Sequence, residues 1–145
     1  MPRILVLYYS SSGNTEKMAG AVAEGAKAIP EVDVELSFYV PAEKLAEHDA
    51  IIIGAPTYHH DMTNSTKKVF EEASSKNINL NGKWGAAFGS YGWSGEAPKL
   101  VLEIMKNKFA MKVIEPPFLV KYSPDESALS ECRQLGKKVA ETLHR

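Results

Sequence analysis

The sequence predicts an α/β protein, a three-layer doubly wound sandwich in which helices cover both faces of a five-stranded parallel sheet. Short apolar runs alternate with amphipathic stretches along the whole chain, which is the pattern of repeated strand-helix units. Residues 50–55, AIIIGA, include no polar side chain, as expected of a central strand covered on both faces. The length of 145 residues fits one domain, so we expect residues 1–145 to share one core.

Five segments are rich in apolar and β-branched residues and are separated by turn-forming residues. The expected strands are 3–9, 32–39, 50–55, 84–89 and 111–120. Pro116 and Pro117 interrupt the fifth strand, which therefore runs over 111–114 and continues over 118–120. A proline has no N–H to donate to a neighbouring strand, so we place the fifth strand at an edge of the sheet.

Helices are expected between the strands, where apolar residues recur every three or four positions. The first helix is expected to begin at Glu16, with apolar residues as far as Ile29, and two others near 42–48 and 62–76. The fourth carries apolar residues from Ala97 to Met105, and a last helix opens with residues 123–126. The last helix has the clearest start, because Ser123-Pro124-Asp125-Glu126 offers an N-cap serine, a proline in the first turn and a capping-box glutamate. The single cysteine, Cys132, falls on the apolar stripe of this helix, so we expect a buried and unreactive thiol.

The composition is that of a soluble globular protein, with 44% apolar residues and a net charge of −1. Basic residues do not cluster with aromatic ones, so we expect no nucleic-acid partner. No apolar run could span a bilayer and no signal peptide precedes the first strand, which predicts a cytoplasmic protein without a membrane partner. We also expect a monomer. The charge is uneven, because residues 16–49 contain eight acidic residues and three lysines, and this predicts one acidic face.

A polar loop separates the first strand from the first helix. It consists of Ser10, Ser11, Ser12, Gly13, Asn14 and Thr15. Its hydroxyls, the Asn14 amide and the N–H groups at the start of the helix can all donate into one concavity. No residue of the loop is positively charged, unlike nucleotide-hydrolysing loops that end in Gly-Lys-Ser/Thr. The loop therefore predicts a site for one phosphate monoester, with an ordinary surface turn and a Thr15 helix cap as the alternative.

Two more loops, after the third and fourth strands, carry aromatic residues without apolar periodicity. The first consists of Pro56, Thr57, Tyr58, His59, His60 and Asp61, and the second includes Ser90, Tyr91, Gly92, Trp93, Gly95 and Glu96. In a doubly wound sheet both loops emerge at the same edge as the phosphate loop. Exposed aromatic side chains favour a planar ring as the ligand, although Tyr91 and Trp93 could instead cap the sheet.

Other chemistries fit these loops less well. His59, His60 and Asp61 are possible metal ligands, but adjacent histidines usually point in different directions and no further ligand follows at a suitable spacing, so we expect no metal. Ser90 lacks the Gly-x-Ser-x-Gly spacing of a nucleophile elbow, so we expect no hydrolase.

The motif Ser10-x-Ser12-Gly13-Asn14-Thr15 resembles the phosphate-binding fingerprint of the flavodoxins, and the whole chain is similar to a short-chain flavodoxin in length and strand pattern. Residues 88–96, FGSYGWSGE, together with Pro56-Thr57, are most similar to the flavodoxin-like domain of the flavo-diiron (A-type) flavoproteins. The resemblance implies a flavodoxin-like fold with strand order 2-1-3-4-5 and FMN as the cofactor.

The resemblance also implies where FMN would lie. Its phosphate would occupy the loop 10–15, and its ring would lie between the loops 56–61 and 90–96, whose residues named above are the candidate ligands. Tyr58 or His59 would flank the ring on one side, and Tyr91 or Trp93 on the other. The flavin would carry the chemistry, while the protein would separate its two one-electron steps.

We therefore expect an FMN-binding electron carrier that shuttles single low-potential electrons between redox partner proteins, such as reductases and ferredoxin-type donors and acceptors. This is an electron-transfer protein rather than an enzyme with a substrate of its own. The alternative is an FMN-dependent NAD(P)H:quinone or flavin reductase, although such enzymes are typically larger. A third reading is a binding module without redox activity, which would show a damaged phosphate loop.

Overall fold

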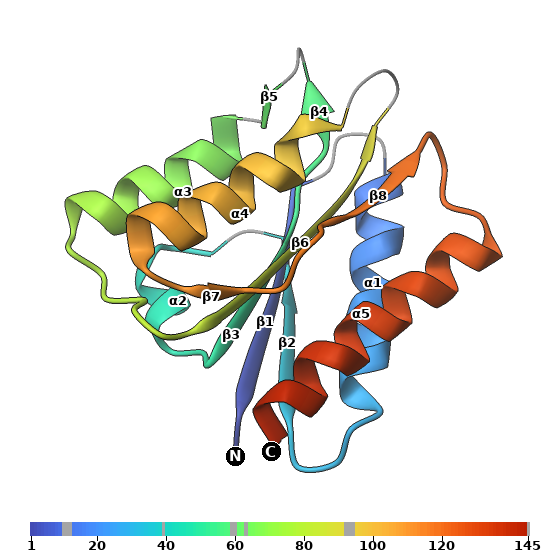
Figure 1. Cartoon of the computed structure of the whole chain (residues 1–145), viewed down its shortest axis with the longest axis horizontal. Helices are drawn as coiled ribbons and strands as arrows, with labels where there is room; N and C mark the ends of the chain where they lie inside the picture. The colour runs from blue at the N-terminus through green and yellow to red at the C-terminus, as the bar shows by residue number, and fades with distance from the viewer. Residues whose placement is uncertain (10–12, 39, 59–60, 63, 92–94, 145) are drawn as a thin grey trace.

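The computed structural model describes residues 1–9, 13–38, 40–58, 61–62, 64–91 and 95–144. A twisted parallel sheet lies between two layers of helices (Figure 1), which confirms the predicted fold class. The strands of the sheet are β1 (Arg3–Tyr8), β2 (Asp33–Ser37), β3 (Ala50–Gly54), β6 (Trp84–Tyr91), β7 (Lys112–Val113) and β8 (Phe118–Lys121). The helices are α1 (Asn14–Lys27), α2 (Glu43–Ala46), α3 (Asn64–Ser75), α4 (Glu96–Phe109) and α5 (Glu126–His144).

The strand order is β2-β1-β3-β6, with β7 and β8 both beside β6 and every pair parallel. Because β7 and β8 are two pieces of one fifth strand, this is the predicted order 2-1-3-4-5. The N–H of Ile114 donates to the Gly85 carbonyl at 2.9 Å where β7 ends, and Pro116 and Pro117 follow before β8 begins. The interrupted strand lies at the edge of the sheet, as the two prolines predict.

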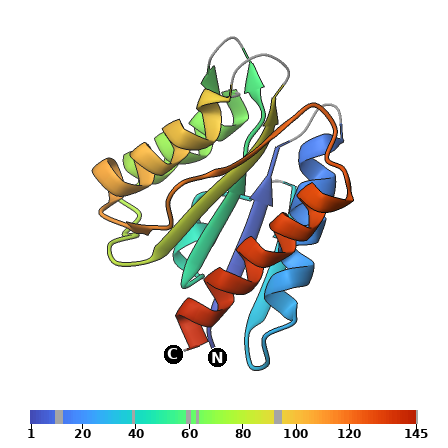
Figure 2. The ribbon, with the colours of Figure 1, turned by 45° about the vertical axis from the view of Figure 1, so that its right-hand side comes forward.

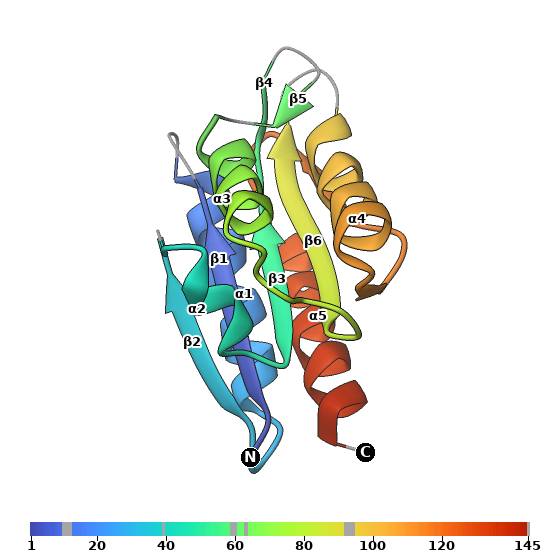
Figure 3. The same ribbon diagram turned by 90° about the vertical axis from the view of Figure 1, so that its left-hand side faces the viewer.

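The sheet divides the core into two parts. Leu5 and Leu7 of β1 pack with residues of α2, α3 and α4, whereas Ile4 and Val6 pack with residues of α1 and α5, because successive side chains of a strand point to opposite faces. Figure 3 shows these two groups of helices on opposite faces of the sheet. Every residue of β3 is buried, which confirms it as a central strand. Cys132 is buried on the α1–α5 side, as predicted, and no helix in the described part of the chain has the length and hydropathy needed to cross a bilayer.

Helices α1 and α5 lie side by side on one face of the sheet (Figure 2). Their backbones touch at two glycines: a Cβ atom on Gly25 would overlap the carbonyl oxygen of Arg133, and one on Gly136 would overlap that of Val22. Only a residue without a side chain fits at either point. This close contact fixes α1 along the sheet and so fixes where its N-terminus lies.

The structure corrects several predicted boundaries. The fourth strand, β6, continues through Ser90 and Tyr91, for which the sequence predicts a loop, because both residues pair with β8. The loop after β3 contains an unpredicted hairpin of β4 (Thr57–Tyr58) and β5 (Asp61–Met62), whose strands are too short to show any periodicity. Helix α1 begins two residues before the predicted start and α3 two residues after it.

The predicted start of the last helix is also wrong. Helix α5 begins at Glu126, and Asp125 caps it, since the Asp125 carboxylate accepts a hydrogen bond from the Ala128 N–H at 2.8 Å. The predicted cap, Ser123, donates its hydroxyl proton to the Asn14 side-chain oxygen instead, at 3.2 Å. Serine and aspartate can both cap a helix. Here the Ser123 hydroxyl is hydrogen-bonded to Asn14, and Asp125 is the residue that caps α5.

Candidate cofactor site

The three predicted loops all leave the carboxyl ends of the central strands β1, β3 and β6, at one edge of the sheet (Figure 3). Open α/β sheets bind their ligands at this edge. The structure describes only part of each loop. The predicted site residues Ser10, Ser11, Ser12, His59, His60, Gly92 and Trp93 lie outside the described residues, and for Tyr58 and Asp61 only the backbone is described.

Gly13 forms the turn from the first loop into α1. Its φ of 87° is in the left-handed region, where glycine pays no steric penalty, and its carbonyl accepts a hydrogen bond from the Lys17 N–H at 3.1 Å. Glycine has no side chain with which to cap the helix. Gly13 therefore places no side-chain cap on the N–H groups of the first turn of α1, and the positive end of the helix dipole favours an anion there.

Thr15 and Ser90 meet inside the site. Their hydroxyl oxygens lie 3.3 Å apart, and the two residues are only 1% and 7% exposed. Thr15 belongs to the first turn of α1 and Ser90 to the end of β6, so this contact joins the first predicted loop to the third. The sequence predicted both residues as ligands but did not predict that they touch.

Gly54 and Gly89 allow the strand ends to pack closely behind this contact. A Cβ atom on Gly54 would lie 2.5 Å from the Phe88 ring and 2.9 Å from the Thr15 methyl group. A Cβ atom on Gly89 would overlap the Ala55 carbonyl oxygen. Larger residues at these two positions would push the first and third loops apart from the second.

Thr57 joins the second loop to the third. Its hydroxyl accepts a hydrogen bond from the Ala97 N–H, in the first turn of α4, at 3.0 Å. Thr57 therefore acts as a cap for a helix that lies 40 residues further along the chain. Glu96, another predicted ligand, is the first residue of α4 and lies beside this contact.

Tyr91 is the last residue of β6 and is half-buried. Its carbonyl accepts a hydrogen bond from the Tyr122 N–H at 2.6 Å. A Cβ atom on Gly95 would lie 3.2 Å from both the Tyr91 ring and the Leu119 side chain, so Tyr91 packs against these neighbours. The Tyr91 ring therefore borders the third loop at Gly95.

The comparisons with known proteins agree on one family. The model of the Flavodoxin family matches residues 6–136. A flavodoxin from Clostridium beijerinckii is 33% identical over 93% of this chain and 97% of its own length. The solved structure of a flavodoxin from the domain Archaea superposes with a TM-score of 0.90 and 38% identity, over 99% of both chains. The chain belongs to the flavodoxin family.

Flavodoxin family proteins bind FMN and carry electrons, and family membership gives FMN as the cofactor of this chain. The similarity extends to larger proteins. The type A flavoprotein fprA of Rhodobacter capsulatus is 36% identical over 97% of this chain, which spans only 33% of that relative. The comparisons thus confirm the resemblance to the flavodoxins and to the type A flavoproteins that the loop motifs predict.

The described residues fit the phosphate of FMN. The first turn of α1 presents N–H donors, Thr15 adds a buried hydroxyl, and Asn14 has its side-chain oxygen held by Ser123 so that its NH₂ group is left to donate. Donors without a fixed positive charge suit a single phosphate monoester. The assignment of the first loop to the phosphate stays a prediction.

Three further side-chain contacts near the first loop were not predicted. Tyr8 donates its hydroxyl proton to the Glu16 carboxylate at 3.3 Å, and the exposed Phe38 packs edge-on against the Tyr8 ring. Burial raises the pKa of Tyr8, and the Glu16 carboxylate raises it further, so the phenol stays protonated. Ser123 reaches Asn14 across 109 residues of sequence. No local pattern signals contacts of this kind.

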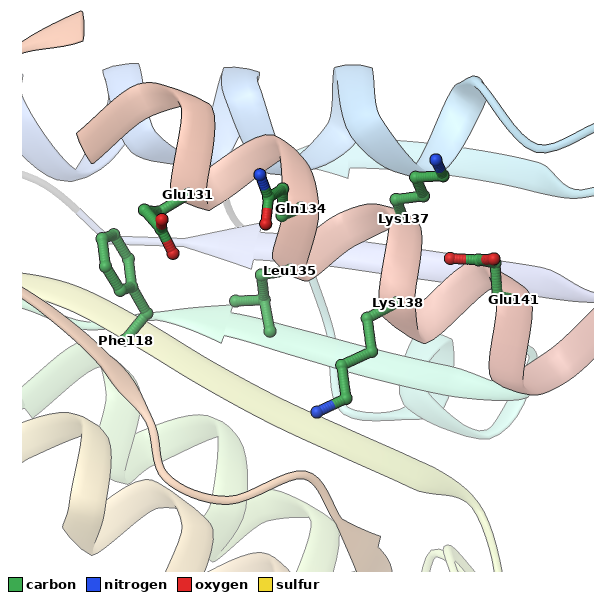
Figure 4. Close-up of a pocket in the computed structure, with 7 residues that line it drawn as sticks. All are labelled: Phe118, Glu131, Gln134, Leu135, Lys137, Lys138 and Glu141. Carbon is green, nitrogen blue, oxygen red and sulfur yellow. The ribbon is translucent and has the colours of Figure 1, made fainter. Parts of the chain in front are cut away.

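A separate groove of about 520 Å³ lies between α5 and β8 (Figure 4). Leu135 points from α5 toward the sheet there, and the rim carries charges of both signs, including Glu131 and Lys138. Its described lining includes no residue of the three loops. The groove is therefore not part of the cofactor site.

Proposed function

We propose that this chain carries single low-potential electrons between redox partner proteins, using FMN held by the three loops at the carboxyl ends of β1, β3 and β6. The observation that supports this most directly is the start of α1, where the N–H groups of the first turn lie beside the buried Thr15 hydroxyl. The three loops supply the candidate ligands, namely residues 10–15, 56–61 and 90–96 apart from Ser94.

The phosphate end of the cofactor sets its position. Gly13 turns the chain so that the N–H groups of Asn14 and Thr15 point out of the helix end, and Ser12 extends the same set of hydroxyls in the sequence. Replacing Ser12 and Thr15 with valine should weaken FMN binding severely, because each change removes a donor to a buried anion.

The ring end lies between the second and third loops. Thr57 fixes the second loop to the start of α4, while Tyr91 is held by the pairing of β6 with β8. The two loops are therefore anchored on rigid elements, and the ring is expected between Tyr58 or His59 and Tyr91 or Trp93. Bound FMN supplies the one-electron chemistry, and the protein holds and orients it.

The same proposal includes a cytoplasmic, monomeric protein whose partners are other redox proteins, and whose surface takes no nucleic acid or membrane. Size-exclusion chromatography of the FMN-loaded protein tests the monomer. Electrons then enter and leave the bound FMN only through partner proteins. NAD(P)H alone should therefore not reduce it.

An anaerobic titration tests the proposal. The purified protein is loaded with FMN and reduced stepwise with dithionite, while spectra are recorded from the near ultraviolet into the red. A long-wavelength band that rises and then falls shows that the protein separates the two one-electron steps. Failure to bind FMN, or sustained reduction by NAD(P)H without a reductase, would overturn the proposal, and the second result would favour a reductase.

A further inference from the structure

The Thr15–Ser90 contact raises the question of which hydroxyl donates. The oxygens lie 3.3 Å apart, which is longer than an ideal O–H···O bond, and either hydroxyl can be the donor. Each residue is almost fully buried, so neither hydroxyl can turn freely to bulk water. The direction of this bond is therefore open in the protein without its cofactor.

A phosphate monoester would fix that direction. At pH 7 it is largely a dianion, and its oxygens then only accept hydrogen bonds. Thr15 has one hydroxyl proton. If that proton goes to the phosphate, the Thr15 oxygen can only accept from Ser90, and the Ser90 hydroxyl must donate.

The surroundings keep the two hydroxyls together. The Thr15 methyl group lies where a Cβ atom on Gly54 would be 2.9 Å away, so the methyl side is filled by protein and the hydroxyl side faces Ser90. Ser90 is fixed in turn by the pairing of β6 with β8. Thr15 is thus held in one orientation relative to the start of α1.

We propose that Ser90 is a positioning residue for the phosphate of FMN: its hydroxyl donates to the Thr15 oxygen and so directs the Thr15 proton at the phosphate. This inference rests on the proposed function. Ser90 acts through Thr15 and does not itself need to contact the cofactor. The pair also couples the phosphate site to the strand that leads into the third loop.

The test compares FMN with riboflavin, which has the same ring and ribityl chain but no phosphate. Ser90→Ala should weaken FMN binding about fivefold, the loss of one modest hydrogen bond, and leave riboflavin affinity within about twofold. Ser90→Thr keeps the hydroxyl and should retain most of the FMN affinity. Affinities are measured by quenching of flavin fluorescence on binding.

A double-mutant cycle separates positioning from independent contacts. If Ser90 acts only through Thr15, the double variant Thr15→Val/Ser90→Ala should bind FMN no more weakly than Thr15→Val alone. Additive losses would mean that Ser90 contacts the phosphate directly, and would overturn the inference. Thr142→Val is the matched control, because it deletes a hydroxyl that donates to the Lys138 carbonyl near the C-terminal end of α5.

The two proposals fail in different ways. If the unmodified protein does not bind FMN, the proposed function fails. If it binds FMN more tightly than riboflavin but Ser90→Ala changes neither affinity, or weakens both equally, only the positioning role fails. Thermal unfolding of each apoprotein shows whether a variant is folded, and Ser90→Thr carries the test if the alanine variant is not.

Discussion

The crossing of α1 and α5 should tolerate no side chain at Gly25. A Cβ atom there would overlap the Arg133 carbonyl oxygen, which belongs to a helix backbone and cannot rotate away. Gly20 provides a matched control in the same helix, since a Cβ atom at Gly20 would meet no atom within 4 Å. Gly25→Ala and Gly20→Ala therefore make the same chemical change and differ only in what the new methyl group meets.

The expected effects have opposite signs. Alanine in place of glycine within a helix gains about 1 kcal/mol of intrinsic stability at either position. Forcing a methyl group into a filled contact costs up to about 3 kcal/mol, so Gly25→Ala should lose about 2 kcal/mol net. A chain of 145 residues unfolds with an entropy of about 0.3 kcal/mol per kelvin, so these changes correspond to about 7 °C lower and about 3 °C higher midpoints.

Calorimetry or circular dichroism of the apoproteins measures both midpoints under the same conditions. FMN affinity provides a second readout, because moving α1 away from α5 also moves the N-terminus that is proposed to bind the phosphate. A Gly25→Ala variant as stable as Gly20→Ala would show that the two helices separate at little cost and would refute the close-contact argument.

Three other changes test separate parts of the structure. Thr57→Val should lower the thermal midpoint by about 3 °C, because the Ala97 N–H loses its acceptor at a cost of about 1 kcal/mol; an unchanged midpoint would contradict the cap. Burial opposes ionisation of Glu35, but the Ser37 hydroxyl and neighbouring basic groups outweigh it and hold the Glu35 pKa below 4.5. Its contribution to stability is present above pH 4.5 and is lost as the pH falls through the folded-state pKa, so Glu35→Gln should flatten the acid limb of the unfolding free energy against pH. Burial raises the pKa of Cys132 to about 12, so iodoacetamide should alkylate the folded protein far more slowly than the urea-unfolded chain, and equal rates would show that the thiol is accessible.

Most of the fold could be predicted because each large element carries its own period of apolar residues. The run 50–55 became the buried central strand β3, and the two prolines placed the fifth strand at the edge. The errors concern features smaller than one period. A strand of two residues, as in the hairpin β4–β5, has no pattern, and the choice between Ser123 and Asp125 as a cap depends on a tertiary contact.

The convergence of the three loops could be predicted because parallel strands place their carboxyl ends together. The contacts between the loops could not. Thr15 and Ser90 are 75 residues apart, and Thr57 caps a helix that begins 39 residues later with Glu96, at its Ala97 N–H 40 residues away. No local sequence pattern predicts contacts over such separations. Tyr91 was assigned to a loop because nothing in the sequence shows that β8 extends the ladder as far as that residue.

The acidic face predicted from residues 16–49 is partly neutralised by basic residues from other parts of the chain. The acidic segment 16–49 forms α1, β2 and α2, so it does lie along the β2 edge of the sheet. Basic groups from outside the segment reach it, however: the Arg3 guanidinium lies 3.5 Å from the Asp33 carboxylate, and the Lys76 ammonium lies 2.9 Å from that of Glu43. Charges of both signs within the Debye length of about 8 Å cancel much of the field that a distant partner would feel. This arrangement favours partner selection by fit at the cofactor loops over long-range electrostatic steering.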